Sequence, residues 1–462
     1  MNNLWTAEEI AQATGGVASA PFAVSGVAFD SREVTGGDLF VAMKGETTDG
    51  HRFVEKAFGQ GATGAIVSEP IAQPHILVPD SAAALEALGR ASRARTSAKI
   101  VGVTGSVGKT GTKEALFQAL DRICPDEVHR SVKSYNNHVG VPLSLSRMPR
   151  DSAFGVFEMG MNHAGELAQL TRQVRPHVAI VTAIAPAHIE FFGTEEKIAQ
   201  AKAEIFEGLE PDGTAIIPYD SPHVATLYAK AEQHAARILT FGFDPEADVR
   251  ARDMVPAANG GTLVTATLPS AELCFTVGAP GEHWVSNALA VLAAVEALGG
   301  DLAAAGLALA EMPGLPGRGE RRVVAVSGGE ALLIDESYNA NPLSMAATLK
   351  QLGKEQANRR IAVLGGMREL GDRSIELHAG LAEPLAAGQV DYAILVGDEM
   401  KPLADALARA QQGVVAFDHV PDTAAATSLI QTEMRAGDAI LVKGSNGIGL
   451  SRLVAALGEN RN

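Results

Sequence analysis

The sequence predicts an α/β protein of three domains, and three observations carry this prediction. The chain has 462 residues, and domains of roughly 150 residues are common, so three domains account for the length. From residue 98 onward, short buried β-branched runs alternate with stretches of helical periodicity. This alternation is typical of a parallel sheet covered by helices. A Pro-, Gly- and Arg-rich segment at 311–322 has the composition of a linker, and the alternation restarts after it.

We expect domains at 1–82, 83–312 and 313–462. The first contains short apolar runs separated by Gly, Asp and Pro, which indicates a small α/β module. The second contains the runs AKIVGVTG, AFGVFEMG and VAIVTAIA with helical stretches between them, which indicates a parallel doubly wound sheet. The third repeats this pattern with ALLIDES, RRIAVLGG, DYAILVGD and DAILVKGS, so we expect a separate Rossmann-like unit.

Charge and composition exclude some classes of partner. The chain has 54 acidic and 38 basic side chains and a formal net charge of −16. Nucleic acid is therefore not expected as a partner, because binding its backbone needs a basic face. A small anionic ligand stays compatible, since a few local donors suffice to hold phosphate. Cys124 and Cys274 are too far apart in sequence to indicate a metal site or a disulfide framework.

The sequence gives no indication of export or of a membrane anchor. The N-terminal residues contain acidic side chains and lack a basic stretch followed by an apolar one, so we expect no secretory leader. The most apolar helical stretch, 286–310, is interrupted by Asn287, Glu296, Asp301 and three glycines, so we expect no membrane span. We therefore expect a cytoplasmic protein.

The strongest local signal is GVTGSVGKTGTKEAL at 102–116, between an expected strand and an expected helix. Amides of a glycine-rich turn and the positive end of the following helix form a cradle for anions. Val103 stands where the strict phosphate-loop pattern has its first glycine, so only the shorter GSVGKT is present. A glycine turn with an incidental lysine is the alternative, but the order of strand, turn, GKT and helix favours an ATP site. The expected nucleotide contacts in this loop are Thr104, Gly105, Ser106, Val107, Gly108, Lys109 and Thr110.

Three further residues could complete a phosphoryl-transfer site. Glu158 and His188 follow two successive expected strands, and ligands of such sheets bind at the carboxyl ends of strands. Glu158 could hold Mg²⁺ there or, equally well, cap the helix that follows it. Lys202 lies among apolar positions of an expected helix, and its pattern does not separate a site lysine from a surface lysine.

Several motifs together resemble the Mur ligase family, whose members form amide bonds with ATP during bacterial peptidoglycan synthesis. The resemblance spans nearly the whole chain and keeps the family's motif order. Its motifs are DSREVTGGDLFVAMKGETTDGHRF, TGSVGKT, YNNHVGVP, FEMGMNHAGEL, AHIEFFG, AKAEIF, GEHWVSNALA, PGRGERR, DESYNANPLSM, LGGMRELG and VKGSNGIGL.

The resemblance implies roles for particular residues. Lys109 and Lys202 would be catalytic together with Glu158 and His188. Thr110, Glu158, His188 and Lys202 would hold Mg²⁺ at two sites, with Lys202 carbamoylated by CO₂. Trp284 stands where many relatives have asparagine, so one contact on the adenine side departs from the family pattern. The nucleotide contacts implied at the domain junction are Asn287, Arg318 and Asn339, and the implied contacts to the UDP-linked substrate are Ser31, Arg32, Asn136 and Asn137.

The resemblance also implies a reaction. DESYNANP and LGGMRELG are most similar to the family member that joins D-Ala-D-Ala to UDP-N-acetylmuramoyl-tripeptide (UDP-MurNAc-tripeptide). The expected reaction uses ATP, passes through an acyl phosphate and serves cell wall synthesis, and hence cell shape, division and the cell cycle. The expected architecture has an N-terminal domain for the UDP substrate, a central phosphate-loop domain and a C-terminal domain for the dipeptide. We expect a monomer.

Two alternatives remain open from the sequence. The first is another step of the same family, or an amide ligase similar to folylpolyglutamate synthetase, which would differ in substrate and not in chemistry. The second is a regulatory protein that uses the phosphate loop as a switch. Glu158, His188 and Lys202 at one sheet edge would favour catalysis over switching.

Overall fold

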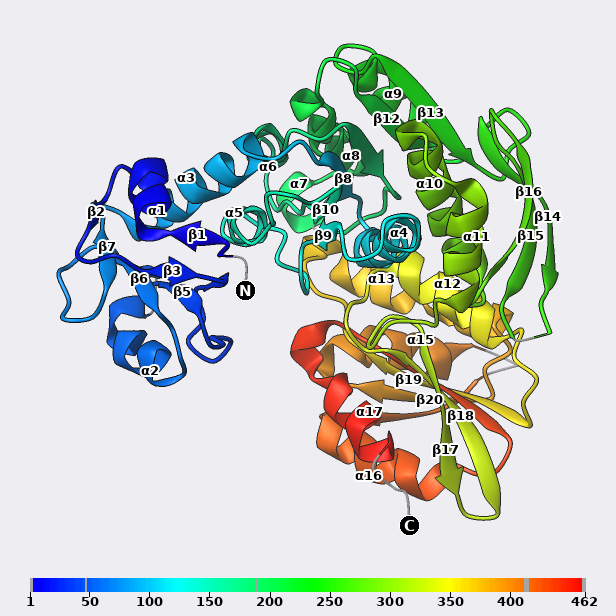
Figure 1. The fold of residues 1–462 in the computed structure, drawn as a ribbon. Coiled ribbons are helices and arrows are strands. Elements are labelled where there is room, and N and C mark those ends of the chain that lie inside the picture. Colours follow the sequence, from blue (N-terminus) through cyan, green and yellow to red (C-terminus); the bar gives the residue numbers. More distant parts are fainter. Residues whose placement is uncertain (1–2, 46–47, 188, 259, 411–414, 459–462) are drawn as a thin grey trace.

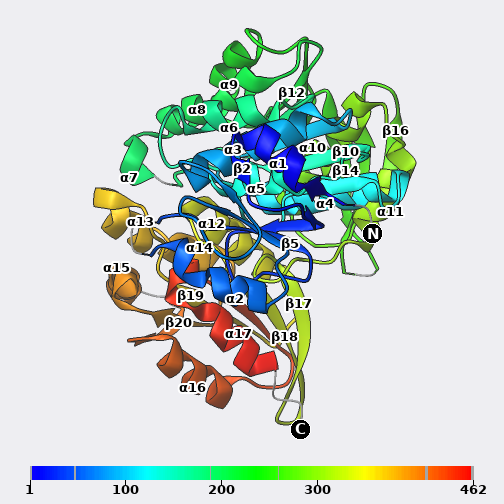
Figure 2. The same ribbon diagram turned by 60° about the vertical axis from the view of Figure 1, so that its left-hand side comes forward.

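The computed structural model describes residues 3–45, 48–187, 189–258, 260–410 and 415–458. Three large sheets follow one another along the chain, and Figure 1 shows them as a blue part, a cyan-to-green part and a yellow-to-red part. The view in Figure 2 is turned by 60° and brings the blue N-terminal part forward. The α/β class and the parallel sheets predicted from the sequence are confirmed. No helix among the described residues is both long enough and apolar enough to cross a membrane.

The N-terminal part is a small α/β module built on a five-stranded sheet of order β2-β7-β6-β5-β4. Its strands β4 to β7 run parallel, and β1 pairs with β3 separately. The first turn of α3 contains residues 82 and 83, where the first domain boundary was expected. The elements are β1 (Trp5–Thr6), α1 (Ala7–Thr14), β2 (Val17–Ala18), β3 (Ala23–Val24), β4 (Gly26–Ala28), β5 (Asp38–Val41), η1 (Gly50–Phe53), α2 (Val54–Gly59), β6 (Gly64–Val67), β7 (His75–Leu77) and α3 (Ser81–Ala94).

The central part is built on a nine-stranded sheet of order β16-β15-β14-β13-β12-β11-β8-β10-β9. Strands β8 to β14 run parallel, and β14, β15 and β16 extend the sheet in antiparallel fashion. The elements are β8 (Lys99–Thr104), α4 (Lys109–Ile123), β9 (Val128–Arg130), α5 (Gly140–Ser146), β10 (Phe154–Glu158), α6 (Glu166–Val174), β11 (Val178–Val181), α7 (Ile189–Phe192), α8 (Glu195–Ala203), η2 (Glu204–Gly208), β12 (Thr214–Pro218), α9 (Val224–Ala231), β13 (Arg237–Gly242), β14 (Val249–Pro256), β15 (Thr262–Thr267), β16 (Glu272–Val277), α10 (Glu282–Leu298) and α11 (Leu302–Glu311).

The C-terminal part is a six-stranded sheet of order β17-β18-β22-β19-β20-β21, antiparallel only between β17 and β18. Part of the segment with linker composition belongs to this sheet, because β17 begins at Glu320. The elements are β17 (Glu320–Val326), β18 (Gly329–Glu336), α12 (Pro342–Leu352), β19 (Arg359–Gly365), η3 (Gly371–Arg373), α13 (Ser374–Ala379), α14 (Ala382–Ala387), β20 (Tyr392–Val396), η4 (Asp398–Met400), α15 (Lys401–Arg409), β21 (Ala416–Val420), α16 (Thr423–Glu433), β22 (Asp438–Lys443), η5 (Asn446–Ile448) and α17 (Leu450–Gly458).

The register of the central sheet aligns the ends of three neighbouring strands. Glu158 at the end of β10 pairs with Val103 of β8, and Val181 at the end of β11 pairs with Thr104. The loops that leave these three strands therefore share one edge of the sheet, which is where ligands of parallel α/β sheets bind. The helical stretch EKIAQAKAEIFEGL expected at 196–209 is an α-helix only as far as Ala203 and continues as the 3₁₀ helix η2. Lys202 still lies in an α-helical turn.

The central and C-terminal parts are in direct contact. Ile189 and Leu370 are both 3% exposed and belong to one hydrophobic cluster with residues from both parts. Beside them, the backbone N–H of Glu190 donates to the carbonyl oxygen of Glu369 at 3.2 Å. In Figure 1 the C-terminal part accordingly lies against the central part below α4, while the N-terminal part lies to one side.

Candidate active site

A cavity of about 510 Å³ lies between the central and C-terminal parts. Its lining includes five Lys or Arg side chains and three Glu side chains among the residues that the structure describes. The lining is therefore locally cationic although the whole chain carries a formal charge of −16. The charged lining residues are Lys109, Lys202, Arg318, Arg368, Lys443, Glu158, Glu336 and Glu369.

The glycine-rich loop lies between β8 and α4 as the sequence predicts. Gly108 has φ +88° and precedes the first residue of α4. A Cβ atom there would lie 2.5 Å from Oδ1 of Asn287, so both conformation and space require glycine. Lys109 Nζ donates to the carbonyl oxygen of Gly105 at 2.7 Å. Burial, and to a smaller extent the charge of Arg318, lowers the pKa of Lys109, although Glu158 acts in the opposite direction.

The other residues expected to contact the nucleotide differ in whether they line the cavity. Gly105, Val107 and Thr110 belong to the loop as expected, and Ser106, Val107 and Gly108 line the cavity. The N–H and hydroxyl of Ser106 donate to the carbonyl oxygens of Ala183 and Ala185, at 2.7 Å and 3.0 Å. Thr104 is fully buried in β8, and its Oγ1 has no hydrogen-bond partner among the described residues.

Glu158 lies at the centre of the polar network. It is 1% exposed, and its carboxylate accepts from Oγ1 of Thr110 at 2.8 Å and from Nδ2 of Asn136 at 2.7 Å. The alternative that Glu158 caps the next helix is wrong. Glu204 fills that role, since it accepts from the N–H groups of Gly165 and Ala168 at the start of α6. The sequence prediction that Glu158 approaches the phosphate loop is therefore met by the geometry.

Lys202 is buried in α8 and faces the same cavity. It is 1% exposed, so it is not a surface lysine, and it forms no hydrogen bond with any residue that the structure describes. Burial lowers its pKa well below the usual value, and the charge of Lys109 lowers it further. His188, expected at the same edge, lies outside the described residues.

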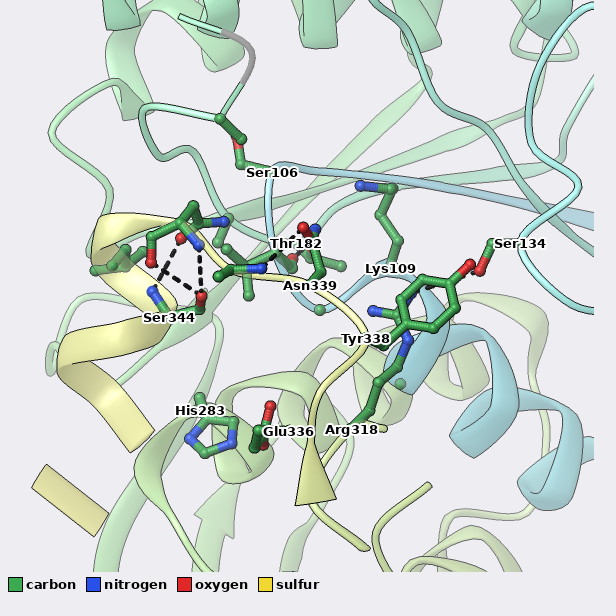
Figure 3. Close-up of a pocket in the computed structure, with 18 of the residues that line it drawn as sticks. Ser106, Lys109, Ser134, Thr182, His283, Arg318, Glu336, Tyr338, Asn339 and Ser344 are labelled. Carbon is green, nitrogen blue, oxygen red and sulfur yellow. Dashed lines mark hydrogen bonds between the residues drawn. The ribbon is translucent and has the colours of Figure 1, made fainter. Parts of the chain in front are cut away.

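The residues expected on the nucleotide side come from both parts. Asn287, Arg318 and Asn339 all line the cavity. Figure 3 shows the Tyr338 ring against the Arg318 side chain, whose Cζ lies 4.2 Å from the ring centroid. Trp284 also lines the cavity and is 7% exposed, with its ring against Gly111 of α4. The ring therefore supports the helix that begins in the phosphate loop.

The residues expected to contact the UDP-linked substrate are not gathered in this cavity, except Asn136. Ser31 is buried in the N-terminal part, and Arg32 is largely exposed, with an ion pair to Asp30 at 2.6 Å. Oδ1 of Asn137 accepts from the N–H groups at the start of α5, so the side chain is engaged in local structure.

The segment 131–136 contacts all three parts of the molecule. Glu33 of the N-terminal part accepts from the Tyr135 hydroxyl at 2.6 Å. Arg318 of the C-terminal part donates to Ser134 at 3.4 Å, and Asn136 bonds to Glu158 in the central part. Figure 3 shows Ser134 beside Arg318. Sequence reasoning assigned a role only to Asn136 of this segment.

Lys443 is a further site residue that sequence reasoning missed. It ends β22 and is 2% exposed, and its Nζ donates to Oε2 of Glu336 at 3.3 Å and to the carbonyl oxygen of Asn339 at 3.1 Å. The signal that could have found it is its place at the carboxyl end of a strand, the same signal that found Glu158.

A glycine-rich loop, an adjoining lysine, and a hydroxyl and a carboxylate at one sheet edge define a nucleotide-binding protein of the phosphate-loop class. Comparison with known families narrows this class. The model of the Mur ligase middle domain matches residues 103–295, that of the Mur ligase glutamate ligase domain matches 317–446, and that of the Mur ligase family catalytic domain matches 23–106.

Similarity to individual proteins agrees with the family models. The UDP-N-acetylmuramoyl-tripeptide–D-alanyl-D-alanine ligase of Synechocystis is 33% identical over 94% of this chain and 92% of the relative. The crystal structure of MurF from Acinetobacter baumannii has a TM-score of 0.85 and 32% identity, over 99% of each chain. MurF from Thermotoga maritima in complex with ADP has a TM-score of 0.79 and 27% identity, over 94% of this chain and 97% of that one. This chain belongs to the Mur ligase family.

Proposed function

We propose that this chain is an ATP-dependent ligase that joins D-alanyl-D-alanine to UDP-MurNAc-tripeptide and forms ADP and phosphate. The observation that carries the proposal is the near-full-length similarity, at 33% identity, to a relative named for this reaction. The cavity supports it, because phosphate-loop residues and C-terminal residues line one space in which a nucleotide and an acceptor could meet.

The proposed reaction begins with transfer of the ATP γ-phosphoryl group to the C-terminal carboxylate of the tripeptide. The amine of the dipeptide then attacks the acyl phosphate, and phosphate leaves. The first step brings two anions together, so positive charge must be placed beside them in advance. Lys109 in the phosphate loop supplies such a charge, and Arg318 faces the same space from the C-terminal part.

Thr110 and Glu158 fit a magnesium ion. Their hydroxyl and carboxylate are already joined at 2.8 Å, and Mg²⁺ in nucleotide sites prefers such oxygen donors together with substrate phosphates. When bound, Mg²⁺ would neutralise charge on the phosphates. Among the described residues no cluster of three or more His, Cys, Asp or Glu could hold a metal by itself, so the ATP phosphates would complete the shell. His188 remains a proposed ligand.

Lys202 is proposed to carry a carbamate formed with CO₂. Carbamate formation requires a neutral amine, and the lowered pKa of the buried Lys202 supports that state. The reaction would convert a side chain that has no partner among the described residues into an anion that could join a second Mg²⁺ site. The negative charge of the carbamate would also attract the charge of Lys109.

Water must be kept from the acyl phosphate, and the contact between the two parts supports this. The buried pair Ile189 and Leu370 and the hydrogen bond from Glu190 to Glu369 close one side of the junction. Trp284 closes another part of the lining and supports α4. Exclusion of water is the usual advantage of domain closure around a reactive intermediate.

The remaining roles follow from the proposed substrates. The N-terminal part would hold the UDP end, with Ser31 and Arg32 as proposed contacts, and Asn136 and Asn137 would lie toward the muramoyl-peptide. Asn287, Arg318 and Asn339 are proposed to contact the nucleotide. The enzyme would act in the cytoplasm as a monomer with domains at 1–82, 83–312 and 313–462. Its product would serve cell wall synthesis and thereby cell shape and division.

One assay tests the proposed function. ADP release is measured with ATP, Mg²⁺, UDP-MurNAc-tripeptide and D-Ala-D-Ala, against panels that pair earlier UDP-muramoyl substrates or folates with single amino acids. Turnover only with the tripeptide and the dipeptide is the expected result. Turnover with another pair would assign a different step of the family, and tight ATP binding without turnover on any pair would favour a nucleotide switch.

A further inference from the structure

On the C-terminal side of the cavity, Arg368 is a lining residue whose positive charge has no partner among the described residues. Its side chain is exposed toward the cavity, and its guanidinium has no hydrogen bond or ion pair with any residue in the described ranges. The other arginine and the lysine on this side differ. Arg318 lies over Tyr338 and bonds to Ser134, and Lys443 is paired with Glu336.

The backbone that carries Arg368 is held from two directions. Its own N–H donates to Oγ of Ser445 at 3.1 Å, and the N–H of Met367 donates to Nε2 of His378 at 2.9 Å. His378 is fully buried, and its Nδ1 lies 2.7 Å from the carbonyl oxygen of Ser374. Since the Met367 amide can only donate, Nε2 must be unprotonated and Nδ1 must carry the proton. The backbone at Met367 and Arg368 is therefore held in place by two hydrogen bonds.

The guanidinium itself lies against a glycine. A Cβ atom at Gly447 would lie 2.3 Å from Nη1 of Arg368, so the absence of a side chain at Gly447 lets the guanidinium lie close to this loop. Gly447 and Ser445 follow β22, and Arg368 follows β19, its neighbour in the sheet. The planar group is thus placed between two loops at the carboxyl edge of the C-terminal sheet, where ligands of such sheets bind.

A guanidinium that has no partner among the described residues is suited to a carboxylate, with which it forms two parallel charge-assisted hydrogen bonds. The incoming dipeptide of the proposed reaction has a free C-terminal carboxylate that does not react, and the C-terminal part, to which Arg368 belongs, is the part expected to hold the dipeptide. The ATP phosphates would lie at the phosphate loop on the opposite, central side, and the C-terminal carboxylate of the tripeptide is the reacting group. We propose that Arg368 binds the C-terminal carboxylate of the incoming dipeptide, an inference that rests on the proposed function.

The test compares Arg368→Met and Arg368→Lys with D-Ala-D-Ala and with D-alanyl-D-alaninamide, which lacks the carboxylate charge. The wild type should show a KM for the amide about tenfold or more above that for the dipeptide. Arg368→Met should raise the KM for the dipeptide by about ten- to a hundredfold, the range of a hydrogen bond between charged groups, and leave the KM for the amide unchanged. Arg368→Lys should recover part of the loss, since charge returns without the planar pair.

The matched control is Arg373→Met, which removes an arginine of the same part that is paired with Glu376 and does not line the cavity. It should leave both KM values unchanged. If Arg368→Met impairs the dipeptide and its amide equally, or raises the KM for UDP-MurNAc-tripeptide or ATP instead, the assignment to the dipeptide is overturned. A wild type inactive on every dipeptide contradicts the proposed function itself, which is a distinguishable result.

Discussion

Lys113 and Lys202 are both buried in helices of the central part, yet their surroundings are opposite. Lys113 is fully buried in α4, and its Nζ donates to the carbonyl oxygens of Ser131 at 2.9 Å and Lys133 at 3.0 Å. It also pairs with Glu114 at 2.8 Å. Lys202 is 1% exposed in α8, with no such acceptor among the described residues and a lowered pKa.

The contrast shows that burial alone does not tell a structural lysine from a reactive one. A buried ammonium is tolerated when acceptors replace its water, as they do around Lys113. Without acceptors the proton is the part that leaves, and the neutral amine that remains is a nucleophile. The first environment holds the segment 131–136 against α4. The second fits the carbamate proposed for Lys202. The distinction between the two lysines leads to different expected outcomes for their variants.

The largest effect is expected at Lys109, whose charge also depresses the pKa of Lys202. Lys109→Ala should lower kcat by about a thousandfold or more, because it removes charge beside the migrating phosphoryl group. Phosphate release with the full substrate set measures the loss. Retention of near-normal kcat would contradict the assignment of the phosphate loop.

Lys202→Ala should lose most activity, by about a hundredfold or more, and small carboxylates such as acetate should restore part of it. The added carboxylate would occupy the place of the proposed carbamate. Lys113→Ala is the matched comparison. Any loss of activity in this variant would come from carbonyl oxygens that have lost their donor and not from a missing anion. Added carboxylates should therefore not restore its activity. A fully active Lys202→Ala enzyme without additive would show that Lys202 is not modified.

Direct detection of the carbamate is the next test. With ¹³C-labelled CO₂, the wild type and Lys113→Met should each show a carbamate carbon signal by NMR that is absent from Lys202→Met. The signal should weaken as the pH falls, because protonation of the amine opposes carbamate formation. The lowered pKa of Lys202 means that the signal persists at pH values where an ordinary lysine, with a pKa of about 10.4, is almost wholly protonated. A carbamate signal that persists in Lys202→Met would come from another residue and would contradict the assignment to Lys202.

The two lysines also show how far sequence reasoning reaches. The strand ends that place Lys109 and Glu158 together follow from local patterns and from the ligand-binding edge of parallel sheets, so both could be predicted. The role of Lys202 came only from the family resemblance, since its helical pattern fits a surface lysine equally well. Lys113 was missed because its acceptors are backbone carbonyl oxygens 18 and 20 residues away, and no side-chain pattern records them.

Other residues of the site illustrate the same limit of sequence reasoning. Asn136 and Asn137 are adjacent and identical in type, yet one bonds to Glu158 and the other to backbone N–H groups at the start of α5. Which of two neighbouring amides faces a site depends on the backbone path of the loop. Arg368 was inside a recognised motif, but its lack of a partner among the described residues became visible only when β19 and β22 were placed side by side.

The smallest effect is expected for Lys113→Met, which keeps the volume of the side chain and removes its ammonium. The buried carbonyl oxygen of Ser131 and the partly buried one of Lys133 would lose their donor, and Glu114 would keep Arg130 as its partner at 2.9 Å. We expect a loss of about 3 kcal/mol in the free energy of unfolding, measured with urea, from the unsatisfied acceptors. Lys197→Met, on the exposed face of α8, is the control and should change stability by less than about 0.5 kcal/mol.

The same variant should reduce kcat by only about tenfold, because Lys113 acts on the site through the segment 131–136 and touches no reacting atom. Ser134 and Asn136 of that segment contact Arg318 and Glu158, so loosening it misplaces both contacts. Lys113→Met would thus lose mainly stability, with an about tenfold loss of activity, and Lys202→Met would lose activity by about a hundredfold or more with most stability kept. If both variants lost stability and activity in the same proportion, the partners of a buried lysine would not decide its role, and the distinction drawn between the two would fall.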